Sequence, residues 1–498
     1  MTLYINNQFH YETENLIRLF FPNDKITVLK EPPDTKQLPF ITALTEETDS
    51  GIKIKVSAEA EGFFSEGEAF AEADPEELEK TTERKLAVCL YDQLVKLTGR
   101  KQPWGILTGV RPIKLFRRLT EQYGQEYAEK YFRDELLVSE EKIKLSSVTE
   151  KYEKQILSLS QPRSFSLYIS IPFCPSRCSY CSFVSQSIES AGKLIEPYLD
   201  LLCREIEYTA DIAKKCSLIL ESVYIGGGTP TTLNAPQLSR LISAVKSSFD
   251  MTVCREFTVE AGRPDTIDSD KLKAILSGGA DRISINPQTM NDRVLELIGR
   301  KHTVSQTLDA FALARETGFK HINMDLIAGL PTESVQSFTD TLDKLCELAP
   351  ESITVHTLAM KRSSRLTLQG KELDTSQEPP AAEMLRYAER KLTSEGYHPY
   401  YLYRQTRMEG NLENVGWAKQ GYDGLYNVFV MDETHTVLGC GAGAVTKLKK
   451  PASESLERIF NYKYPYEYIN GFGELLRRKE RVTEFYAELA EYISQICL

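Results

Sequence analysis

The chain has 498 residues, of which 41% are hydrophobic and 26% charged, and its formal net charge is −11 at pH 7. This length predicts two or three domains with ample core, and the composition is that of a soluble globular protein. The acidic balance argues against a nucleic-acid partner, because phosphate binding needs a basic surface. No apolar run approaches the roughly 18 residues of a membrane span, and the first residues, Met-Thr-Leu-Tyr-Ile-Asn-Asn, do not resemble a signal peptide.

The first 160 residues predict an α+β accessory domain. Gly51 to Ser57 alternates apolar and polar residues, as a half-exposed strand does. The apolar positions Leu86, Leu90 and Leu94 then recur at the spacing of one helix face.

A glycine- and proline-rich stretch, Pro103 to Pro112, predicts an ordered turn before a run of charged amphipathic helices. Trp104 and Arg111 in this turn would line a ligand pocket. The alternative is that Trp104 is a packing anchor, the commoner role of a large apolar side chain.

A cysteine-rich loop follows at 167–185. Leu167 to Ile171 predicts a short apolar strand, which Pro172 ends because proline has no amide to continue a ladder. The thiols therefore lie at the carboxyl end of a strand, where chemistry collects in barrels and open α/β folds. The spacing C-x3-C-x2-C is formed by Cys174, Cys178 and Cys181.

Three thiols this close cannot all pair with one another, so a metal site, a cluster or chance spacing remains. Structural zinc takes four ligands, and no fourth Cys or His is nearby. Three thiolates suit a [4Fe–4S] cluster with one iron left open for a chelating ligand. The other seven of the ten cysteines are scattered, which suits a reducing cytoplasm.

From 165 to about 360, strand-like and helix-like segments alternate, which predicts a parallel sheet with right-handed crossovers. The predicted strands are Leu167–Ile171, Leu218–Ile225, Glu256–Glu260, Arg282–Asn286, Asn323–Ile327 and Ser352–Thr357. The predicted helices are 190–214, 235–249, 268–277, 290–299, 303–317 and 334–348.

Glycines and polar residues follow these strands. Gly226 to Pro230 lets the backbone approach a ligand closely, although a tight turn alone would also explain it. Glu260 ends its strand and would accept ribose hydroxyls or be solvated at the sheet edge.

Three further candidates follow later strands, and each has a structural explanation as well. Gln288 carries an amide that donates and accepts, and Arg300 has a planar fork that suits a carboxylate. Asp325 lies inside an apolar strand, where an unpaired charge would be costly. Their order along successive strands favours function.

Residues 376–498 are less regular and predict a C-terminal α+β extension that covers the substrate. A helix is expected at 381–395, a tyrosine-rich stretch runs from Tyr397 to Tyr403, and Leu438 to Ala444 is a glycine-rich turn.

The cysteine loop after a strand resembles the radical S-adenosylmethionine (SAM) superfamily. The other motifs resemble one branch of it, the oxygen-independent coproporphyrinogen III oxidases (coproporphyrinogen dehydrogenases). The matching pieces are Tyr-Ile-Ser-Ile-Pro-Phe-Cys at 168–174, Gly-Gly-Gly-Thr-Pro-Thr at 226–231, Glu260, Pro-Gln at 287–288, Arg300 and Asp-Leu-Ile-Ala-Gly-Leu-Pro at 325–331. The long N-terminal region and Gly-Asn-Leu-Glu-Asn-Val-Gly at 410–416 resemble the HemZ type.

The resemblance implies an α/β fold: an incomplete (β/α)6 TIM-like radical SAM barrel at 161–375 between the α+β domain at 1–160 and the extension at 376–498. It implies a [4Fe–4S] cluster and one or two SAM molecules. In the superfamily the open iron binds the amino and carboxylate groups of SAM, and one electron splits the sulfonium to give a 5′-deoxyadenosyl radical.

Site roles follow from the same resemblance. The cluster ligands would be Cys174, Cys178 and Cys181. Contacts with the SAM on the cluster would come from Tyr168, which is also the catalytic candidate, Gly227 and Glu260. Positions matching contacts to a second SAM are Tyr180, Gly228, Thr229, Gln288, Arg300, Asp325 and Ala359.

The implied reaction is the oxidative decarboxylation of two propionates of coproporphyrinogen III to vinyl groups, giving protoporphyrinogen IX. The expected partners are a tetrapyrrole substrate and a low-potential electron donor such as flavodoxin or ferredoxin, with no nucleic acid and no membrane span. The expected location is the cytoplasm.

Two features depart from the characterised oxidases. Phe183 stands where they carry a further cysteine, as in haem-chaperone relatives, and residues 1–30 hold no arginine- and tyrosine-rich segment. A haem-binding or haem-transfer protein is therefore a second hypothesis. A radical SAM enzyme acting on another tetrapyrrole is a third.

Overall fold

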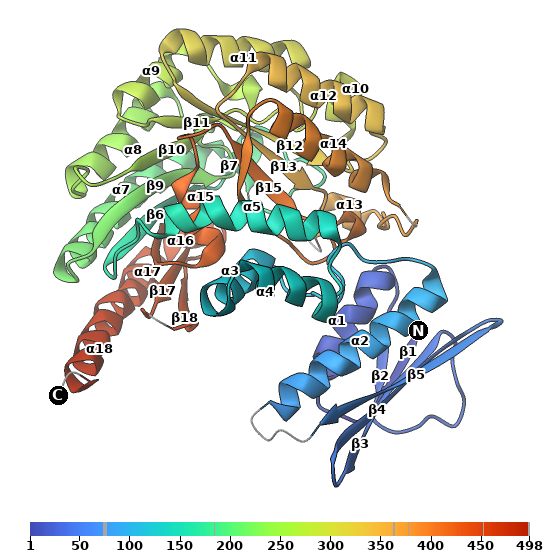
Figure 1. Ribbon diagram of the computed structural model, residues 1–498. Helices are drawn as coiled ribbons and strands as arrows, with labels where there is room; N and C mark the ends of the chain where they lie inside the picture. Colours follow the sequence, from blue (N-terminus) through green and yellow to red (C-terminus); the bar gives the residue numbers. More distant parts are fainter. Residues whose placement is uncertain (73–76, 184, 362–363, 377, 452, 497–498) are drawn as a thin grey trace. The chain divides into compact units, whose positions relative to one another are not determined.

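The computed structural model describes residues 1–72, 77–183, 185–361, 364–376, 378–451 and 453–496, with the backbone alone for 491–496 (Figure 1). The chain forms two compact units. Unit 1 comprises Met1–Glu150, Gly370–Glu383 and Leu402–Glu413, and unit 2 comprises Lys151–Gln369, Met384–Tyr401 and the chain from Asn414 onward. The expected boundaries at 160 and 375 stay predictions.

Unit 1 is built on a five-stranded sheet in the order β2-β1-β3-β4-β5, packed against helices α1 and α2. Strand β1 pairs in parallel with β2 and β3, whereas β3, β4 and β5 form an antiparallel meander. The elements are β1 (Thr2–Ile5), α1 (His10–Phe20), β2 (Thr27–Leu29), β3 (Phe40–Thr48), β4 (Gly51–Ala60), β5 (Phe63–Glu72) and α2 (Leu78–Thr98).

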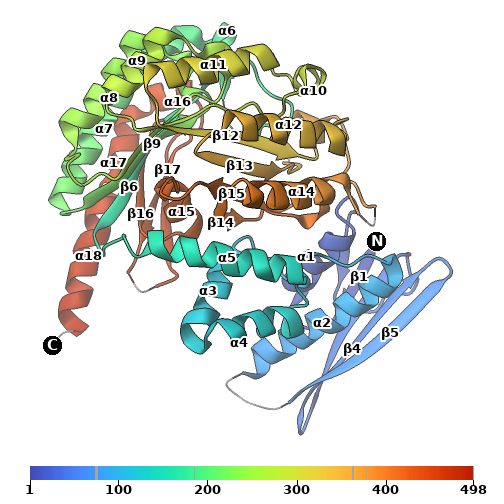
Figure 2. The same ribbon diagram turned by 45° about the horizontal axis from the view of Figure 1, so that its top comes forward.

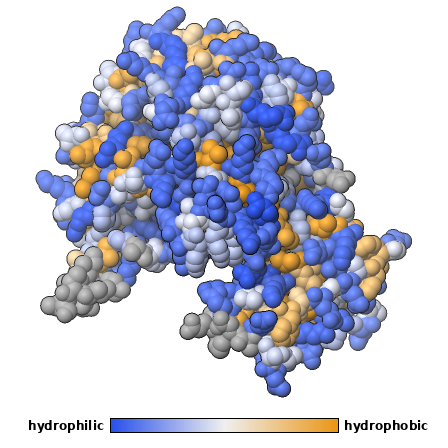
Figure 3. All heavy atoms as spheres, in the orientation of Figure 1, coloured by the Kyte–Doolittle hydropathy of each residue, from blue (hydrophilic) through white to orange (hydrophobic). Residues whose placement is uncertain are grey.

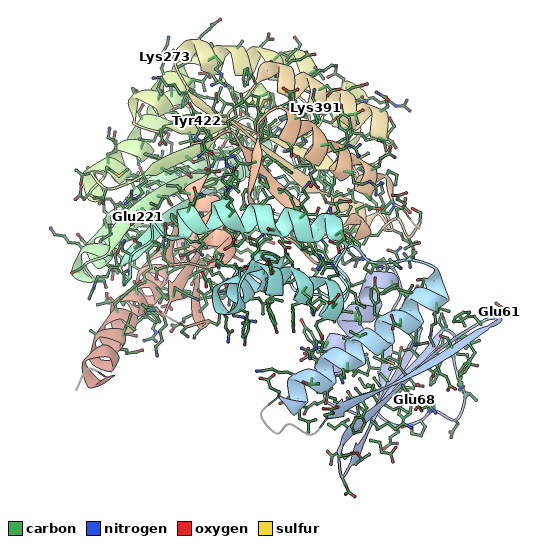
Figure 4. The ribbon with its side chains drawn as sticks, viewed as in Figure 1. Glu61, Glu68, Glu221, Lys273, Lys391 and Tyr422 are labelled. Atoms are coloured by element: carbon green, nitrogen blue, oxygen red, sulfur yellow. The ribbon has the colours of Figure 1, made fainter. Side chains whose placement is uncertain are left out.

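The predicted strand at 51–57 and the helix through Leu86, Leu90 and Leu94 are confirmed as β4 and α2. These three leucines are buried in the core of unit 1 because they share one face of α2. The polar strand face points away from this core. Figure 4 labels Glu68 on β5, which pairs with Lys53 on β4, and Glu61 at the turn between the two strands.

The rest of the N-terminal region is helical, and the turn at 103–112 precedes it. Its elements are α3 (Pro112–Tyr123), α4 (Gln125–Lys130), the π-helix η1 (Tyr131–Glu135) and α5 (Glu140–Leu157). Trp104 is fully buried, and its indole nitrogen donates to Glu413 at 2.8 Å. Lys142 donates to the same carboxylate at 2.7 Å. Trp104 is therefore a packing residue within unit 1, and its expected role as an anchor onto the next domain stays a prediction.

The centre of unit 2 is a run of six parallel strands in the order of the chain. They are β6 (Ser164–Ile171), β9 (Ile219–Gly227), β10 (Glu256–Glu260), β11 (Arg282–Ser284), β12 (His321–Ala328) and β13 (Ser352–Thr357). Each overlaps a predicted strand, and β10 and β13 match their predicted bounds, whereas β9 begins one residue after Leu218 and β11 ends two residues before Asn286. Across the described residues the sheet ends at β14 and β18, so the parallel strands form an incomplete barrel.

Helices connect these strands and lie along the outer side of the curved sheet (Figures 1 and 2). They are α7 (Ile195–Lys215), α8 (Ala235–Ser248), α9 (Ser269–Ser277), α10 (Asp292–Leu297), α11 (Val304–Thr317), α12 (Val335–Leu348) and α14 (Pro380–Ser394). The short elements near the cysteine loop and after β13 are β7 (Phe173–Cys174), β8 (Gln186–Ser187), α6 (Ile188–Ala191) and α13 (Arg365–Leu368). All seven connecting helices overlap predicted ones.

The C-terminal segment of unit 2 adds strands at both ends of the parallel run. Strand β15 pairs antiparallel with β13, and β16 pairs in parallel with β6, so that Gly439 lies opposite Tyr168. The elements are β14 (His398–Tyr403), β15 (Asn414–Ala418), α15 (Leu425–Asp432), β16 (Thr436–Cys440), β17 (Val445–Lys449), β18 (Leu456–Phe460), α16 (Pro465–Asn470), α17 (Phe472–Lys479) and α18 (Arg481–Ile496).

Hydrophilic side chains cover most of the face drawn in Figure 3, as expected for a chain of net charge −11. None of the described helices combines the length and the apolar character that crossing a bilayer requires.

Candidate functional site

The cysteine loop begins directly beyond β6, as the proline after that strand predicted. Cys174 lies on β7, Cys178 is buried, and Cys181 is half-buried. All three are free thiols. Burial, together with the neighbouring thiols of Cys178 and Cys174, raises the pKa of Cys181 to about 11.

The loop is anchored on the segment that precedes α11. The amide of Ser179 donates to the carbonyl of Ile298 at 2.9 Å, and the Ser176 hydroxyl donates to the carbonyl of Gly299 at 3.2 Å. Backbone and side-chain hydrogen bonds therefore hold the loop in place on both sides of Cys178.

The glycine-rich segment after β9 lies against the cysteine loop. The Thr229 hydroxyl is 3.5 Å from the Cys174 sulfur and donates to it, and the Thr229 amide donates to the carbonyl of Phe173. A Cβ added to Gly228 would lie 3.0 Å from that sulfur and 2.6 Å from the Phe173 carbonyl oxygen. Gly227 has φ +107°, a conformation that residues with a side chain rarely adopt. The glycines therefore let this segment pack directly against the cysteine loop, where a side chain at position 228 would clash with the backbone.

Glu260 lies at the carboxyl end of β10 and accepts a hydrogen bond from the hydroxyl of Tyr224 on β9. Burial raises the pKa of Glu260 to about 7, and the nearby Asp325 adds to the rise. An added Cβ on Gly226 would lie 3.0 Å from the Glu260 Oε2. The carboxylate therefore lies against the glycine segment.

Aromatic rings surround this carboxylate. Tyr168 on β6 lies opposite Tyr224 in the parallel ladder, and both rings stack with Tyr426 of α15, at centroid distances of 6.2 and 4.4 Å respectively. Burial and the Glu260 carboxylate raise the pKa of Tyr168. Tyr168 is therefore a neutral, hydrogen-bonding side chain at neutral pH.

Tyr180 and Arg300 meet beside the cysteines. The Nε of Arg300 donates to the Tyr180 hydroxyl at 3.2 Å, and its Nη1 donates to the carbonyls of Gly262 and Asn286 at 3.0 and 2.6 Å. Arg300 is 8% exposed. These bonds fix the guanidinium at the carboxyl end of β10 and β11, with its charge near the loop.

Gln288 and Asp325 lie side by side on neighbouring chain segments. The Gln288 amide donates to the Asp325 carbonyl at 2.9 Å, and the Gln288 backbone has φ +69°. Its side-chain oxygen is buried and has no hydrogen-bond partner among the described residues. A buried amide oxygen without a partner is costly, which indicates a donor supplied by a ligand.

The Asp325 carboxylate is held ionised. Burial alone would raise its pKa, but the nearby His356, whose Nε2 lies 3.8 Å from Oδ2, and a hydrogen bond from Asn323 lower the pKa below its ordinary value. The Asn323 amide donates to Oδ1 at 2.7 Å. Asp325 is therefore a fixed negative charge at this edge of the sheet.

The structure thus groups most of the predicted site residues at the carboxyl ends of the parallel strands. Ala359 is connected to the group only by its place, two residues beyond β13, where its carbonyl accepts from the amide of Lys361. Two residues that sequence reasoning missed are Tyr224, inside a strand, and Arg263, which donates to the Cys178 sulfur at 3.6 Å. Neither belongs to a spacing motif that would have marked it.

Comparisons with known proteins agree with this geometry. Residues 168–345 match the radical SAM superfamily. The chain is 33% identical to the oxygen-independent coproporphyrinogen-III oxidase-like protein HemZ of Bacillus subtilis, over 99% of this chain and 97% of that protein. It is 31% identical to the heme chaperone HemW of Lactococcus lactis, over 61% of this chain and 74% of that one.

A solved structure is similar as well. Coproporphyrinogen III oxidase (HemN) from Escherichia coli, a radical SAM enzyme, matches with a TM-score of 0.51 and 26% identity, over 64% of this chain and 71% of its own. The superfamily match and this neighbour imply a [4Fe–4S] cluster and SAM as cofactors of this chain.

The residues present fit that cluster. Across the described residues, no three His, Cys, Asp or Glu side chains converge on one metal ion. Iron–sulfur clusters are held by cysteine thiolates. In a [4Fe–4S] cluster each thiolate binds a different iron atom, so the thiolates do not need to converge on one ion. Three thiols in one loop and the unpartnered oxygen of Gln288 suit a cluster and a polar cofactor. The chain belongs to the radical SAM superfamily and, within it, to the oxygen-independent coproporphyrinogen-III oxidase-like family of the HemZ type.

Proposed function

We propose that this protein is a radical SAM enzyme that converts two propionate side chains of coproporphyrinogen III to vinyl groups, giving protoporphyrinogen IX. The observation that carries the proposal is the set of site residues at the carboxyl ends of consecutive parallel strands. The full-length likeness to a coproporphyrinogen-III oxidase-like protein supports the choice of substrate.

When bound, the cluster and SAM would supply a 5′-deoxyadenosyl radical, which would take a hydrogen atom from the β-carbon of a propionate. The substrate then loses CO2 and gives one electron to a one-electron acceptor as the vinyl group forms. The protein's part is to place the propionate and the cofactor and to exclude water.

In this proposal Cys174, Cys178 and Cys181 bind the cluster. Glu260 accepts hydrogen bonds from ribose hydroxyls, and Gly227 presents backbone to the methionyl ammonium. Tyr168, which is neutral and half-buried, lies near Glu260 and contacts the bound SAM in this proposal.

A second group of residues, which includes Arg300, Gln288 and Asp325, is proposed to bind a second ligand. Arg300, held on the carbonyls of Gly262 and Asn286, offers its remaining donors to a carboxylate. Gln288 offers its unpartnered oxygen to a donor on a ligand, and Asp325 offers a fixed negative charge to an ammonium or hydroxyl group. We assign the second SAM, or the propionate that reacts, to this group, which further comprises Tyr180, Gly228, Thr229 and Ala359.

The reaction needs an external reductant for the cluster. A low-potential donor such as flavodoxin or ferredoxin is the proposed partner, and the cytoplasm is the proposed location.

A haem-binding or haem-transfer role is the second candidate. Phe183 is 62% exposed at the end of the cysteine loop, and the chain is 31% identical to the heme chaperone HemW of Lactococcus lactis. An exposed aromatic ring beside the loop is a surface on which a flat macrocycle stacks. A radical SAM enzyme on another tetrapyrrole is the third candidate.

The test is an anaerobic assay of the reconstituted full-length protein with SAM, dithionite and coproporphyrinogen III. We expect equal amounts of 5′-deoxyadenosine and released CO2, and protoporphyrinogen IX by mass spectrometry. Cys178→Ala is the inactive control and Cys346→Ala, on α12, is the matched active control.

Stoichiometric haem binding without turnover of SAM would select the second candidate. Formation of 5′-deoxyadenosine with a product of another mass, from another tetrapyrrole, would select the third. A protein that assembles the cluster and does none of these would refute the proposal.

A further inference from the structure

A buried arginine that no motif marks lies directly on the cysteine loop. Arg263 is 3% exposed and lies in the loop after β10. Its Nη1 donates to the Ser176 carbonyl at 3.2 Å and to the Cys178 sulfur at 3.6 Å, and its Nη2 donates to the Ser176 hydroxyl at 3.1 Å. The guanidinium thus binds both Ser176, two residues before Cys178, and the sulfur atom of Cys178.

Asp265 holds this guanidinium in place. The Nε of Arg263 donates to Oδ1 at 3.1 Å and Nη2 donates to Oδ2 at 3.2 Å, a two-point contact that fixes the plane of the fork. The contact is well shielded, because the two side chains are 4% and 16% exposed.

Two other titratable groups face this pair. The His302 Nδ1 lies 3.9 Å from Asp265 Oδ1, and burial and the nearby Arg300 lower the pKa of His302 to about 3, so this imidazole is neutral. Arg300 adds a positive charge from the Tyr180 side of the loop. The field at Cys178 therefore comes from Arg263 and Arg300, opposed by Asp265.

We infer that Arg263 tunes the cluster as a positioning residue: it fixes the loop at Ser176 and raises the reduction potential of the cluster by donating to the Cys178 thiolate, while Asp265 moderates the effect. This inference rests on the proposed assignment of Cys178 as a cluster ligand. Hydrogen bonds to the sulfurs and local charge set the potential of an iron–sulfur cluster. A cationic donor stabilises the added electron, and a carboxylate beside it opposes that gain.

Substitutions of the two partners of the Arg263–Asp265 ion pair should shift the midpoint potential of the cluster in opposite directions. Arg263→Gln removes the cation and shifts the midpoint potential to more negative values. Asp265→Asn leaves the cation without its counter-charge and shifts the potential to more positive values. Loss of loop order alone would not give opposite signs.

The experiment is a redox titration of the reconstituted full-length protein, followed by the electron paramagnetic resonance signal of the reduced cluster, with iron content measured in parallel. The control is Arg255→Gln, which breaks a more exposed arginine–carboxylate pair at the opposite end of β10, where the Arg255 Nε donates to Glu221 at 2.9 Å (Glu221 is labelled in Figure 4). We expect wild-type potential in this control and opposite shifts in the two test variants.

Equal potentials in all four proteins, or shifts of the same sign, would overturn the inference. If Arg263→Gln loses its iron, the test rests on Asp265→Asn, which keeps the guanidinium. The midpoint potential of that variant must still be more positive than that of the wild type. A wild-type protein that assembles no cluster would instead refute the proposed ligand set.

Discussion

The hydroxyl of Tyr224 donates a hydrogen bond to the carboxylate of Glu260, with 2.5 Å between the two oxygens. The two side chains come from neighbouring parallel strands, and the Tyr224 ring is stacked on Tyr426. The Tyr224 hydroxyl therefore orients the Glu260 carboxylate, and the stacking on Tyr426 fixes the Tyr224 ring. This leaves Glu260 ready to accept a ligand's hydroxyl groups in one fixed direction.

The first prediction concerns pH. Burial raises the pKa of Glu260 to about 7, and only the ionised form accepts two hydroxyl donors without carrying a proton. SAM affinity should therefore rise with pH, by about tenfold between pH 6 and pH 8 for a group that titrates near 7. Anaerobic calorimetric titration measures this. Glu260→Gln should bind more weakly and show no such rise, and a wild-type affinity that is level across this range would contradict the assignment.

The second prediction concerns the donor. Tyr224→Phe removes a hydrogen bond to a charged group, which stabilises the ionised form of Glu260 by about 1.5–3 kcal/mol, so less of the carboxylate is ionised and SAM affinity at pH 7 should fall by about tenfold or more. The bond lowers the pKa of Glu260, so the pH at which affinity rises should also move upward. Tyr422→Phe, labelled in Figure 4 and 37% exposed, is the control and should match the wild type. An unchanged pH midpoint in Tyr224→Phe would show that the hydroxyl does not act on Glu260.

Much of the barrel was predictable because its determinants are local. The strands β10 and β13 are short apolar runs bounded by polar or turn residues, and the helices between strands begin at residues that cap them. Asn234 and Thr303 form capping boxes that set the starts of α8 and α11. Strand alternating with helix then allows few topologies.

The pairings of the C-terminal segment were not predictable in this way. Strand β16 lies beside β6, about 270 residues earlier in the chain, and β15 closes on β13 in the antiparallel sense. A run such as Thr436–Cys440 shows that a strand exists but not which edge it joins. The same limit applies to the site, where Arg263 reaches Cys178 from another loop and no spacing rule connects the two.

The third prediction concerns the cluster ligands. Cys178→Ser should leave the folded protein without its iron and without the absorption of an iron–sulfur cluster, because hard oxygen ligands hold such iron poorly. Cys346→Ser, at a half-buried position on α12, should retain both. Iron and sulfide analysis after anaerobic reconstitution measures the difference. Equal iron in the two variants would remove Cys178 from the ligand set.

The fourth prediction concerns the stability of unit 1. Lys142 and Glu413 form an ion pair whose side chains are 4% and 2% exposed. Lys142→Met leaves the Glu413 carboxylate with Trp104 but without that cation, and breaking such a buried pair costs about 3–5 kcal/mol.

The urea transition, followed by fluorescence of the two tryptophans, should therefore shift to lower concentration. Lys53→Met, which breaks an exposed pair with Glu68, should change the free energy of unfolding by about 0.5 kcal/mol or less. Equal shifts in the two variants would mean that the buried pair does not stabilise unit 1.

The fifth prediction concerns the glycine-rich turn at 441–444, which lies against the end of β6. It is shorter than the predicted turn at 438–444, because Leu438–Cys440 complete β16. The Gly441 amide donates to the buried Glu205 at 2.8 Å, and the Ser170 hydroxyl donates to the Ala442 carbonyl at 2.8 Å. A Cβ on Gly441 would lie 2.5 Å from both the Ser170 carbonyl oxygen and the Tyr198 hydroxyl. Gly441→Ala must therefore displace β6 just before the cysteine loop.

The matched control is Gly443→Ala, because Gly443 also has positive φ, +76° against +93° for Gly441, but an added Cβ there would meet nothing closer than 3.8 Å. The positive φ destabilises both variants by about 1–2 kcal/mol, and only Gly441→Ala adds a steric clash. Hydrogen–deuterium exchange of the peptide covering Ser164–Ile171 should be faster in Gly441→Ala than in Gly443→Ala, with lower iron retention. Identical exchange in the two would mean that the turn does not hold β6, and the cluster loop would then depend on its other contacts, among them those at Gly299, Arg263 and Thr229.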